Sequence, residues 1–213
     1  MKKFVAELIG TFALVFCGTG AIVINDVTNG IVSHVGIAIT FGLIVTVMIY
    51  AFGNISGAHI NPAVSIAFSV TDRFEKKNLL GYILAQLFGA FLASGVLKIL
   101  FSEHENLGAT LPNGDWQQSF ILEIILTYLL MIVILFVSQN KSVNHFTGLA
   151  VGSIVALEAM FAGPITGASM NPARSIAPAI VSGNISDLWI YIIAPIIGAV
   201  SASLTWNLMR ENE

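Results

Sequence analysis

Long apolar runs alternate with short polar stretches along the whole chain. A helix needs about 20 apolar residues to cross the hydrocarbon core of a bilayer. Polar stretches such as "TDRFEKKN" and "SEHENLGATLPNGDW" separate the runs and predict loops. The pattern therefore predicts six membrane-spanning helices, at residues 4–24, 35–53, 79–101, 117–138, 146–163 and 188–208.

Two further apolar segments are too short to cross a bilayer. They are "PAVSIAFSV" at 62–70 and "PARSIAPAIV" at 172–181. Each begins with proline, which fits the first position of a helix because the N–H there has no helical partner. Each follows an asparagine, a favoured N-cap residue. The two segments are therefore predicted as half-length helices, one after the second span and one after the fifth.

Composition supports an integral membrane protein. Of 213 residues, 56% are hydrophobic and 10% are charged, whereas about 25% of a typical soluble domain is charged. The net charge of −3 gives no reason to expect nucleic acid as a partner, and the single Cys17 cannot form a disulfide within the chain. Glu7 interrupts the first apolar run and no clear cleavage site follows, so this run is interpreted as a span and not as a removed signal peptide.

The basic residues predict the orientation, because cytoplasmic loops carry an excess of lysine and arginine. With six spans, seven of the nine basic residues fall on one side: Lys2, Lys3, Arg73, Lys76, Lys77, Lys141 and Arg210. The two exceptions are Lys98 and Arg174. Both termini are therefore expected in the cytoplasm, with the first half-helix entering from the cytoplasmic side and the second from outside.

The chain contains an internal repeat. "SGAHINPAVSIA" at 56–67 and "TGASMNPARSIA" at 166–177 share eight of twelve positions. The first span of each half also carries one glutamate, Glu7 or Glu123. Two halves of three spans each, about 1–101 and 117–213, must be inverted because three is odd. Inverted repeats with broken helices place the functional site at their interface, near the middle of the membrane.

The paired Asn-Pro-Ala motifs before matching half-helices resemble those of the aquaporin, or major intrinsic protein, family across essentially the whole chain. The motif residues are Asn61, Pro62, Ala63, Asn171, Pro172 and Ala173. The resemblance implies an all-α membrane protein, with a right-handed bundle of six transmembrane helices plus two re-entrant half-helices. It further implies a single channel domain over 1–213, a homotetramer in the cell membrane, and no metal or other cofactor.

Two half-helices entering from opposite faces would meet with their N-termini, and their positive dipole ends would both face the pore. The resemblance implies that Asn61 and Asn171 cap these ends and present amide N–H groups to the passing solute. Unwound residues would supply carbonyl oxygens: Gly57, Ala58, His59, Gly167, Ala168 and Ser169. His59 itself has two open interpretations, lining the inner mouth or packing within its loop.

Ionisable residues at membrane depth are candidate functional residues. The resemblance assigns Glu7 and Glu123 to hold the two re-entrant loops, and Arg174 to a narrow outer constriction where it donates to solute oxygens and repels cations. Glu158 has two readings. We favour a hydrogen bond to the backbone of the outer re-entrant loop, and the alternative is a charge partner for Arg174.

Four positions carried over from the family define the constriction: Phe41, Ala159, Ala168 and Arg174. Strict water channels usually carry histidine where this chain has Ala159, so a wider opening is expected. Glycerol facilitators usually carry aspartate where this chain has Ser175. The phrase "AGPITGASMNPARS" is most similar to nodulin-like intrinsic proteins of plants and their bacterial relatives.

The expected function is therefore a passive channel for water and small neutral solutes, namely glycerol or metalloid hydroxides such as arsenous, boric or silicic acid, that excludes protons and ions. One alternative is a strict water channel. Another is an ion-coupled secondary transporter, which can also have inverted repeats and broken helices. An enzyme is not expected, because the sequence shows no metal-ligand cluster and no activated nucleophile.

Overall fold

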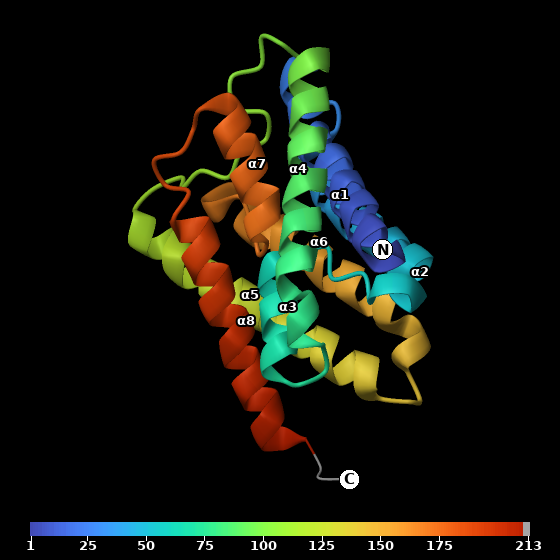
Figure 1. Ribbon diagram of the computed structural model, residues 1–213. Helices are drawn as coiled ribbons and strands as arrows, with labels where there is room; N and C mark the ends of the chain where they lie inside the picture. The colour runs from blue at the N-terminus through green and yellow to red at the C-terminus, as the bar shows by residue number, and fades with distance from the viewer. Residues whose placement is uncertain (211–213) are drawn as a thin grey trace.

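The computed structural model describes residues 1–210, which form helices and loops without a strand (Figure 1). Two short 3-10 turns, η1 (Lys76–Asn78) and η2 (Asn144–Phe146), precede α4 and α6. The α-helices are α1 (Lys2–Val27), α2 (Ser33–Ser56), α3 (Pro62–Val70), α4 (Leu79–Leu100), α5 (Trp116–Gln139), α6 (Thr147–Thr166), α7 (Pro172–Ser182) and α8 (Ile190–Met209).

The predicted fold class is confirmed. Six helices of the described chain are long and apolar enough to cross a membrane, and α3 and α7 are the two half-helices. Several of the long helices, among them α2 and α6, extend past the predicted apolar runs at their C-terminal ends. Thus α2 and α6 end only at Gly57 and Gly167, which adopt left-handed φ angles of 85° and 81°.

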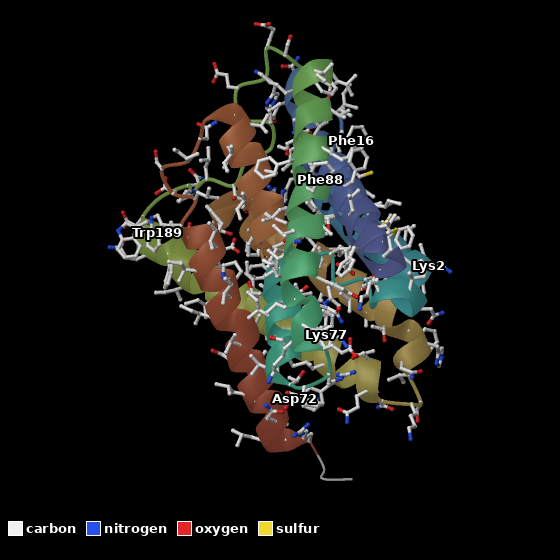
Figure 2. All side chains as sticks on the ribbon, viewed as in Figure 1. Lys2, Phe16, Asp72, Lys77, Phe88 and Trp189 are labelled. Atoms are coloured by element: carbon white, nitrogen blue, oxygen red, sulfur yellow. The ribbon has the colours of Figure 1, made fainter. Side chains whose placement is uncertain are left out.

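The outer face of the bundle is apolar. On α4, residues four positions apart are exposed and form one stripe, and Phe88 stands on this outer face in Figure 2. The stripe consists of Leu80, Leu84, Phe88, Leu92 and Val96. The opposite face of α4 buries small and polar residues that include Gln86, Gly89 and Ser94. This distribution, with the exposed side more apolar than the buried one, suits a helix surrounded by lipid.

Each half contains a closely packed helix pair, α1 with α4 and α5 with α8. A Cβ atom on Gly89 would overlap the carbonyl oxygen of Leu8, and one on Gly198 would overlap that of Ile124. Glycine at these two equivalent positions lets the helix backbones touch, as is common between membrane helices.

The half-helices pack across the repeat. α3 belongs to the first half and packs against α8 of the second, while α7 belongs to the second half and packs against α4 of the first. Figure 1 shows α7 above α3 beside the long α4. This exchange brings the N-termini of α3 and α7 together in the interior of the bundle, where the candidate site lies.

Candidate functional site

Two short loops of matching conformation meet in the interior, 57–61 before α3 and 167–171 before α7. Both contain alanine and a larger side chain in the left-handed region: Ala58 and Ile60 have φ of 46° and 43°, and Ala168 and Met170 have φ of 43° and 54°. Such conformations cost on the order of 1–3 kcal/mol per residue and persist only where the surroundings hold them.

Glu7 holds the first of these loops. Its Oε1 accepts hydrogen bonds from the backbone N–H of His59 (2.9 Å) and the hydroxyl of Ser56 (2.7 Å). Its Oε2 accepts from the N–H of Ile60 (2.7 Å) and from Gln86 Nε2 (2.7 Å). The carboxylate is fully buried, and each oxygen accepts two donors, so the group is well satisfied despite its depth.

Glu123 occupies the equivalent place in the second half. Its Oε1 accepts from the N–H of Ser169 (2.8 Å) and from Thr166 Oγ1 (2.8 Å), and its Oε2 accepts from the N–H of Met170 (2.9 Å). The two glutamates therefore replace the backbone hydrogen bonds that an unwound loop cannot make for itself.

The two asparagines cap the half-helices and bind each other's loop. Asn61 Oδ1 accepts from the N–H of Ala63 (2.9 Å), and Asn171 Oδ1 accepts from the N–H of Ala173 (3.0 Å). Asn61 Nδ2 donates to the Met170 carbonyl (2.8 Å), and Asn171 Nδ2 donates to the Ile60 carbonyl (2.9 Å). Each amide thus donates one N–H to the opposite loop and has a second N–H free for another acceptor.

A cavity of about 110 Å³ runs along this junction and is lined by both halves of the chain. It extends from Ser138 and Thr147 past the two asparagines to the side chain of Arg174. The predicted site residues that line it are Phe41, Gly57, Ala58, His59, Asn61, Ala159, Ala168, Ser169, Asn171 and Arg174. The other predicted site residues are not among its lining residues: Pro62, Ala63, Gly167, Pro172, Ala173 and the two loop-holding glutamates, Glu7 and Glu123.

The four residues predicted for the constriction all line this cavity. The guanidinium carbon of Arg174 lies 5.0 Å from the centre of the Phe41 ring, within the range of a cation–π contact. Arg174 Nη1 donates to the carbonyl of Gly108 (2.7 Å), while its Nε has no partner among residues 1–210. Ala159 and Ala168 add only methyl groups.

His59 combines the two interpretations left open by the sequence. Its ring packs among three aromatic rings, with centroid distances of 4.7 Å to Phe68, 4.9 Å to Phe74 and 5.1 Å to Tyr82. Its Nδ1 lies 3.1 Å from Ser65 Oγ. The residue is 8% exposed and also lines the cavity, so one side of a packed histidine faces the open space.

The favoured reading of Glu158 was wrong. Its side chain is 1% exposed, yet neither carboxylate oxygen has a hydrogen-bond partner within residues 1–210. It therefore does not bond to the re-entrant loop, and the described part of the chain shows no ion pair between Glu158 and Arg174. The position beside Ala159 in the sequence did not reveal what faces Glu158 in space.

The sequence interpretation missed several supporting residues. Ser56 and Thr166 each donate to a glutamate and accept the N–H of Ala58 or Ala168 two residues later (3.0 and 2.8 Å). They occupy equivalent positions of the repeat, so the alignment carried a signal for them. Gln86 has no such signal. Its counterpart in the second half is Pro195, which has no side-chain donor.

This arrangement defines a membrane channel built from an inverted repeat with two re-entrant half-helices. The chain matches the family described as Major intrinsic protein over residues 1–206. It is 48% identical to Aquaporin NIP1-1 of Zea mays, covering 99% of this chain and 75% of that protein, and 45% identical to Nodulin-26 of Glycine max, covering 99% and 78%. The chain therefore belongs to the aquaporin, or major intrinsic protein, family.

A solved structure agrees with this assignment. The aquaglyceroporin from Plasmodium falciparum superposes with a TM-score of 0.87 at 28% identity, covering 98% of this chain and 96% of that one. The family comprises channels and not enzymes, as expected, and the similarity to NIP-type aquaporins confirms the predicted branch of the family. The protein is thus a multi-pass membrane channel.

Proposed function

We propose that this protein is a passive channel for water and for small neutral polyols or metalloid hydroxides, of which glycerol and arsenous acid are representative. The observation that supports the proposal is the set of side chains that line the cavity at the predicted constriction: one aromatic ring, one guanidinium and two methyl groups, from Phe41, Arg174, Ala159 and Ala168. A trihydroxy solute can donate to and accept from polar groups on one edge while its less polar face lies on the ring.

The two asparagines are proposed to orient the solute at the centre. Each retains one amide N–H beyond its bond to the opposite loop. Asn61 and Asn171 also mark the N-termini of α3 and α7, where the helix dipoles place partial positive charge. A cation that has lost its hydration meets this positive potential and the charge of Arg174, which disfavours passage of protons and metal ions.

Short side chains at two of the four predicted constriction positions favour a solute larger than water over a strict water channel. Ala159 and Ala168 are 7% and 6% exposed and border the cavity directly, so no side chain longer than a methyl group projects from these two positions. The relative from Plasmodium falciparum is named an aquaglyceroporin, and its fold is shared over nearly the whole chain. A strict water channel would need another residue to fill this space.

An ion-coupled transporter is less well supported. Coupling requires an ionisable group that a passing ion can reach. Glu7 and Glu123 already accept hydrogen bonds from both loops, and Glu158 is not among the residues that line the cavity. Glu7 and Glu123 are therefore better explained as structural groups, and Glu158 does not face the path of a passing ion.

The protein is further proposed to act as a homotetramer in the cell membrane, as one channel domain over 1–213 with repeats at about 1–101 and 117–213. The basic residues near α3 and α4, Arg73, Lys76 and Lys77, favour a cytoplasmic location for that end of the bundle. Both termini would then lie in the cytoplasm, although the C-terminal residues 211–213 lie outside the described residues.

A substitution at the constriction tests the solute. Ala159→His would place a ring and a donor beside Arg174 and Phe41. We expect glycerol and arsenous acid flux into proteoliposomes to fall by roughly 10-fold or more, because a loss of about 1.4 kcal/mol in the interaction with the solute corresponds to a factor of ten. Most of the water flux should remain. Ser153→His adds the same side chain to an exposed position of the same helix and serves as the control.

Two results would contradict the proposal. The first is wild-type protein that passes water but excludes glycerol and every small metalloid acid, which would indicate a strict water channel. The second is a solute flux that depends on a proton or sodium gradient, which would indicate a coupled transporter.

A further inference from the structure

The loop between α4 and α5, residues 101–115, supplies the sole hydrogen bond of the Arg174 guanidinium within the described chain. That bond is the one from Nη1 to the carbonyl of Gly108, at 2.7 Å. Gly108 and the preceding Leu107 both have left-handed φ angles, 71° and 49°, and Leu107 is fully buried. Because the left-handed region is unfavourable for leucine, the place of the Gly108 carbonyl depends on the contacts that hold this turn.

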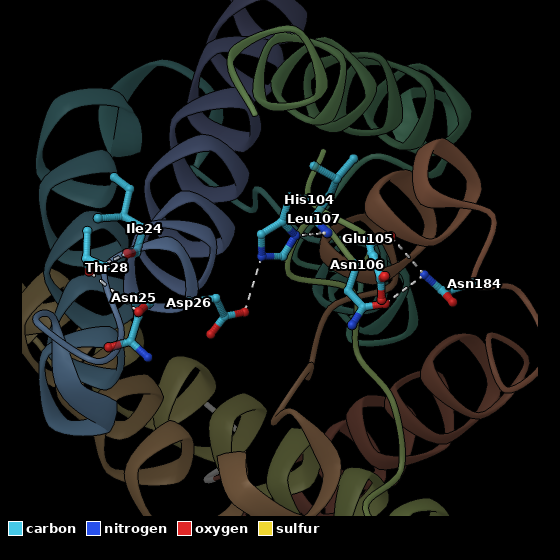
Figure 3. A network of polar contacts seen from close by, with 9 residues as sticks. All are labelled: Ile24, Asn25, Asp26, Thr28, His104, Glu105, Asn106, Leu107 and Asn184. Carbon is cyan, nitrogen blue, oxygen red and sulfur yellow. Dashed lines mark hydrogen bonds and ion pairs between the residues drawn. The ribbon is translucent and has the colours of Figure 1, made fainter. Parts of the chain in front are cut away.

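His104 makes two of those contacts, one on each ring nitrogen. Figure 3 shows its ring between Asp26, near the end of α1, and Leu107 on its own loop. Nδ1 accepts the backbone N–H of Leu107 (3.0 Å), and Nε2 lies 3.2 Å from Asp26 Oδ2. A ring nitrogen that accepts a hydrogen bond carries no proton, so the two contacts define a neutral ring with its proton on Nε2.

The remaining contacts of the turn do not involve a titrating group. Asn184 Nδ2, from the connection after α7, donates to Asn106 Oδ1 (3.0 Å) and to the Glu105 carbonyl (3.3 Å), as Figure 3 also shows. The N–H of Ala109 donates to the carbonyl of Asn106 (2.8 Å). The bond from Leu107 to His104 is therefore the link in this turn that a single proton can break.

We propose that His104 is a positioning residue for Arg174, and that a second proton on its ring releases the turn and lowers solute flux. A proton on Nδ1 turns this nitrogen into a donor that faces the Leu107 N–H, so the Leu107 N–H loses its acceptor. The Gly108 carbonyl, on the next residue, then leaves Arg174. The guanidinium, without its partner, moves into the opening that it lines. The inference rests on the proposed function, since it concerns flux through that opening.

Three acidic side chains and one lysine lie around His104. Asp26 faces it from α1, and Glu103 and Glu105 lie on its own loop and border the same surface hollow. Lys98 of α4 is the nearby cation, and its Nζ donates to the carbonyl of Ser102. Asn184, from the connection after α7, is neutral. Since Nε2 already carries its proton, the added proton must go to Nδ1.

Two substitutions at His104 distinguish its role as a hydrogen-bond acceptor from its ability to take up a proton. In His104→Asn, the amide oxygen stands where Nδ1 stood, so it can accept the Leu107 N–H but cannot take a proton. In His104→Gln, the longer amide reaches toward Asp26 and leaves the Leu107 N–H without an acceptor. His145→Asn changes an exposed histidine on η2, in the connection between α5 and α6, and serves as the matched control.

The experiment measures glycerol and water flux into cells or oriented vesicles, with the outer pH lowered from about 7.5 to about 5, the range in which histidine ordinarily gains its charge. Loss of one hydrogen bond changes a two-state equilibrium constant by roughly 2- to 10-fold, so wild-type flux should fall by up to about that factor. His145→Asn should keep the wild-type pH profile. His104→Asn should lose the pH dependence, and His104→Gln should show the low flux at both pH values.

The inference is overturned if wild-type flux stays constant over this pH range, or if His104→Asn retains the decrease. If His104→Gln does not fold, the comparison of His104→Asn with the control decides alone. Wild-type protein that carries neither solute at either pH would refute the proposed function itself, which distinguishes the two failures.

Discussion

Two buried glutamates near the second re-entrant loop should respond oppositely to the same substitution. Glu123 is fully buried and accepts hydrogen bonds from three donors, including the N–H groups of Ser169 and Met170. Glu158 is 1% exposed and has no hydrogen-bond partner among residues 1–210. Glu→Gln preserves the shape of both side chains and removes one acceptor oxygen, so it isolates the value of these hydrogen bonds.

The magnitude follows from the donors left without a partner. In Glu123→Gln, an amide NH₂ group replaces one carboxylate oxygen, so at least one loop N–H and one amide N–H stay unsatisfied in the interior. Each costs about 1–3 kcal/mol, which gives a loss of about 2–6 kcal/mol in the free energy of unfolding. In Glu158→Gln no hydrogen bond is lost, and removal of a carboxylate without a partner is expected to be neutral or stabilising.

Thermal unfolding of the purified protein in detergent measures the difference, with tryptophan fluorescence and size-exclusion as readouts. One kcal/mol corresponds to about 2–4 °C in a domain of this size. We therefore expect Glu123→Gln to lower Tm by at least about 4 °C, and Glu158→Gln to leave it unchanged or raise it. If Glu158→Gln lowers Tm as much as Glu123→Gln does, the inference from hydrogen-bond partners is refuted.

Two other predictions concern packing and orientation. Gly198→Ala puts a methyl group onto the carbonyl of Ile124, so we expect a loss of about 1–3 kcal/mol of stability, while Gly95→Ala, which meets no atom within 4 Å, should be neutral or slightly stabilising in the same Tm measurement. A membrane-impermeant label on a cysteine at Asn106 should react from outside the cell, whereas an N-terminal tag should be accessible only after permeabilisation; labelling of Asn106 from the cytoplasm would contradict the six-span orientation.

The sequence by itself determined the number of spans, the two half-helices and the inverted repeat. The spans and half-helices are local features, because the thickness of the hydrocarbon imposes a run of about 20 apolar residues, and because proline after an asparagine N-cap is favoured at the start of a helix. The repeat also placed Glu7 and Glu123 at equivalent positions, and both turn out to contact the loops. The α-helix bounds were less predictable, since α2 and α6 continue until the left-handed Gly57 and Gly167.

Only the tertiary structure decided which groups meet. Asn61 donates to Met170 across the repeat, Gly108 reaches Arg174 from a loop without any periodic pattern, and His104 lies against Asp26. Glu158 shows the limit most clearly. Its neighbours in the sequence suggested a partner, but a side chain on a helix faces whatever the other helices bring to it. Those contacts arise from packing between segments far apart in the chain, where the spacing in the sequence does not by itself determine the distance.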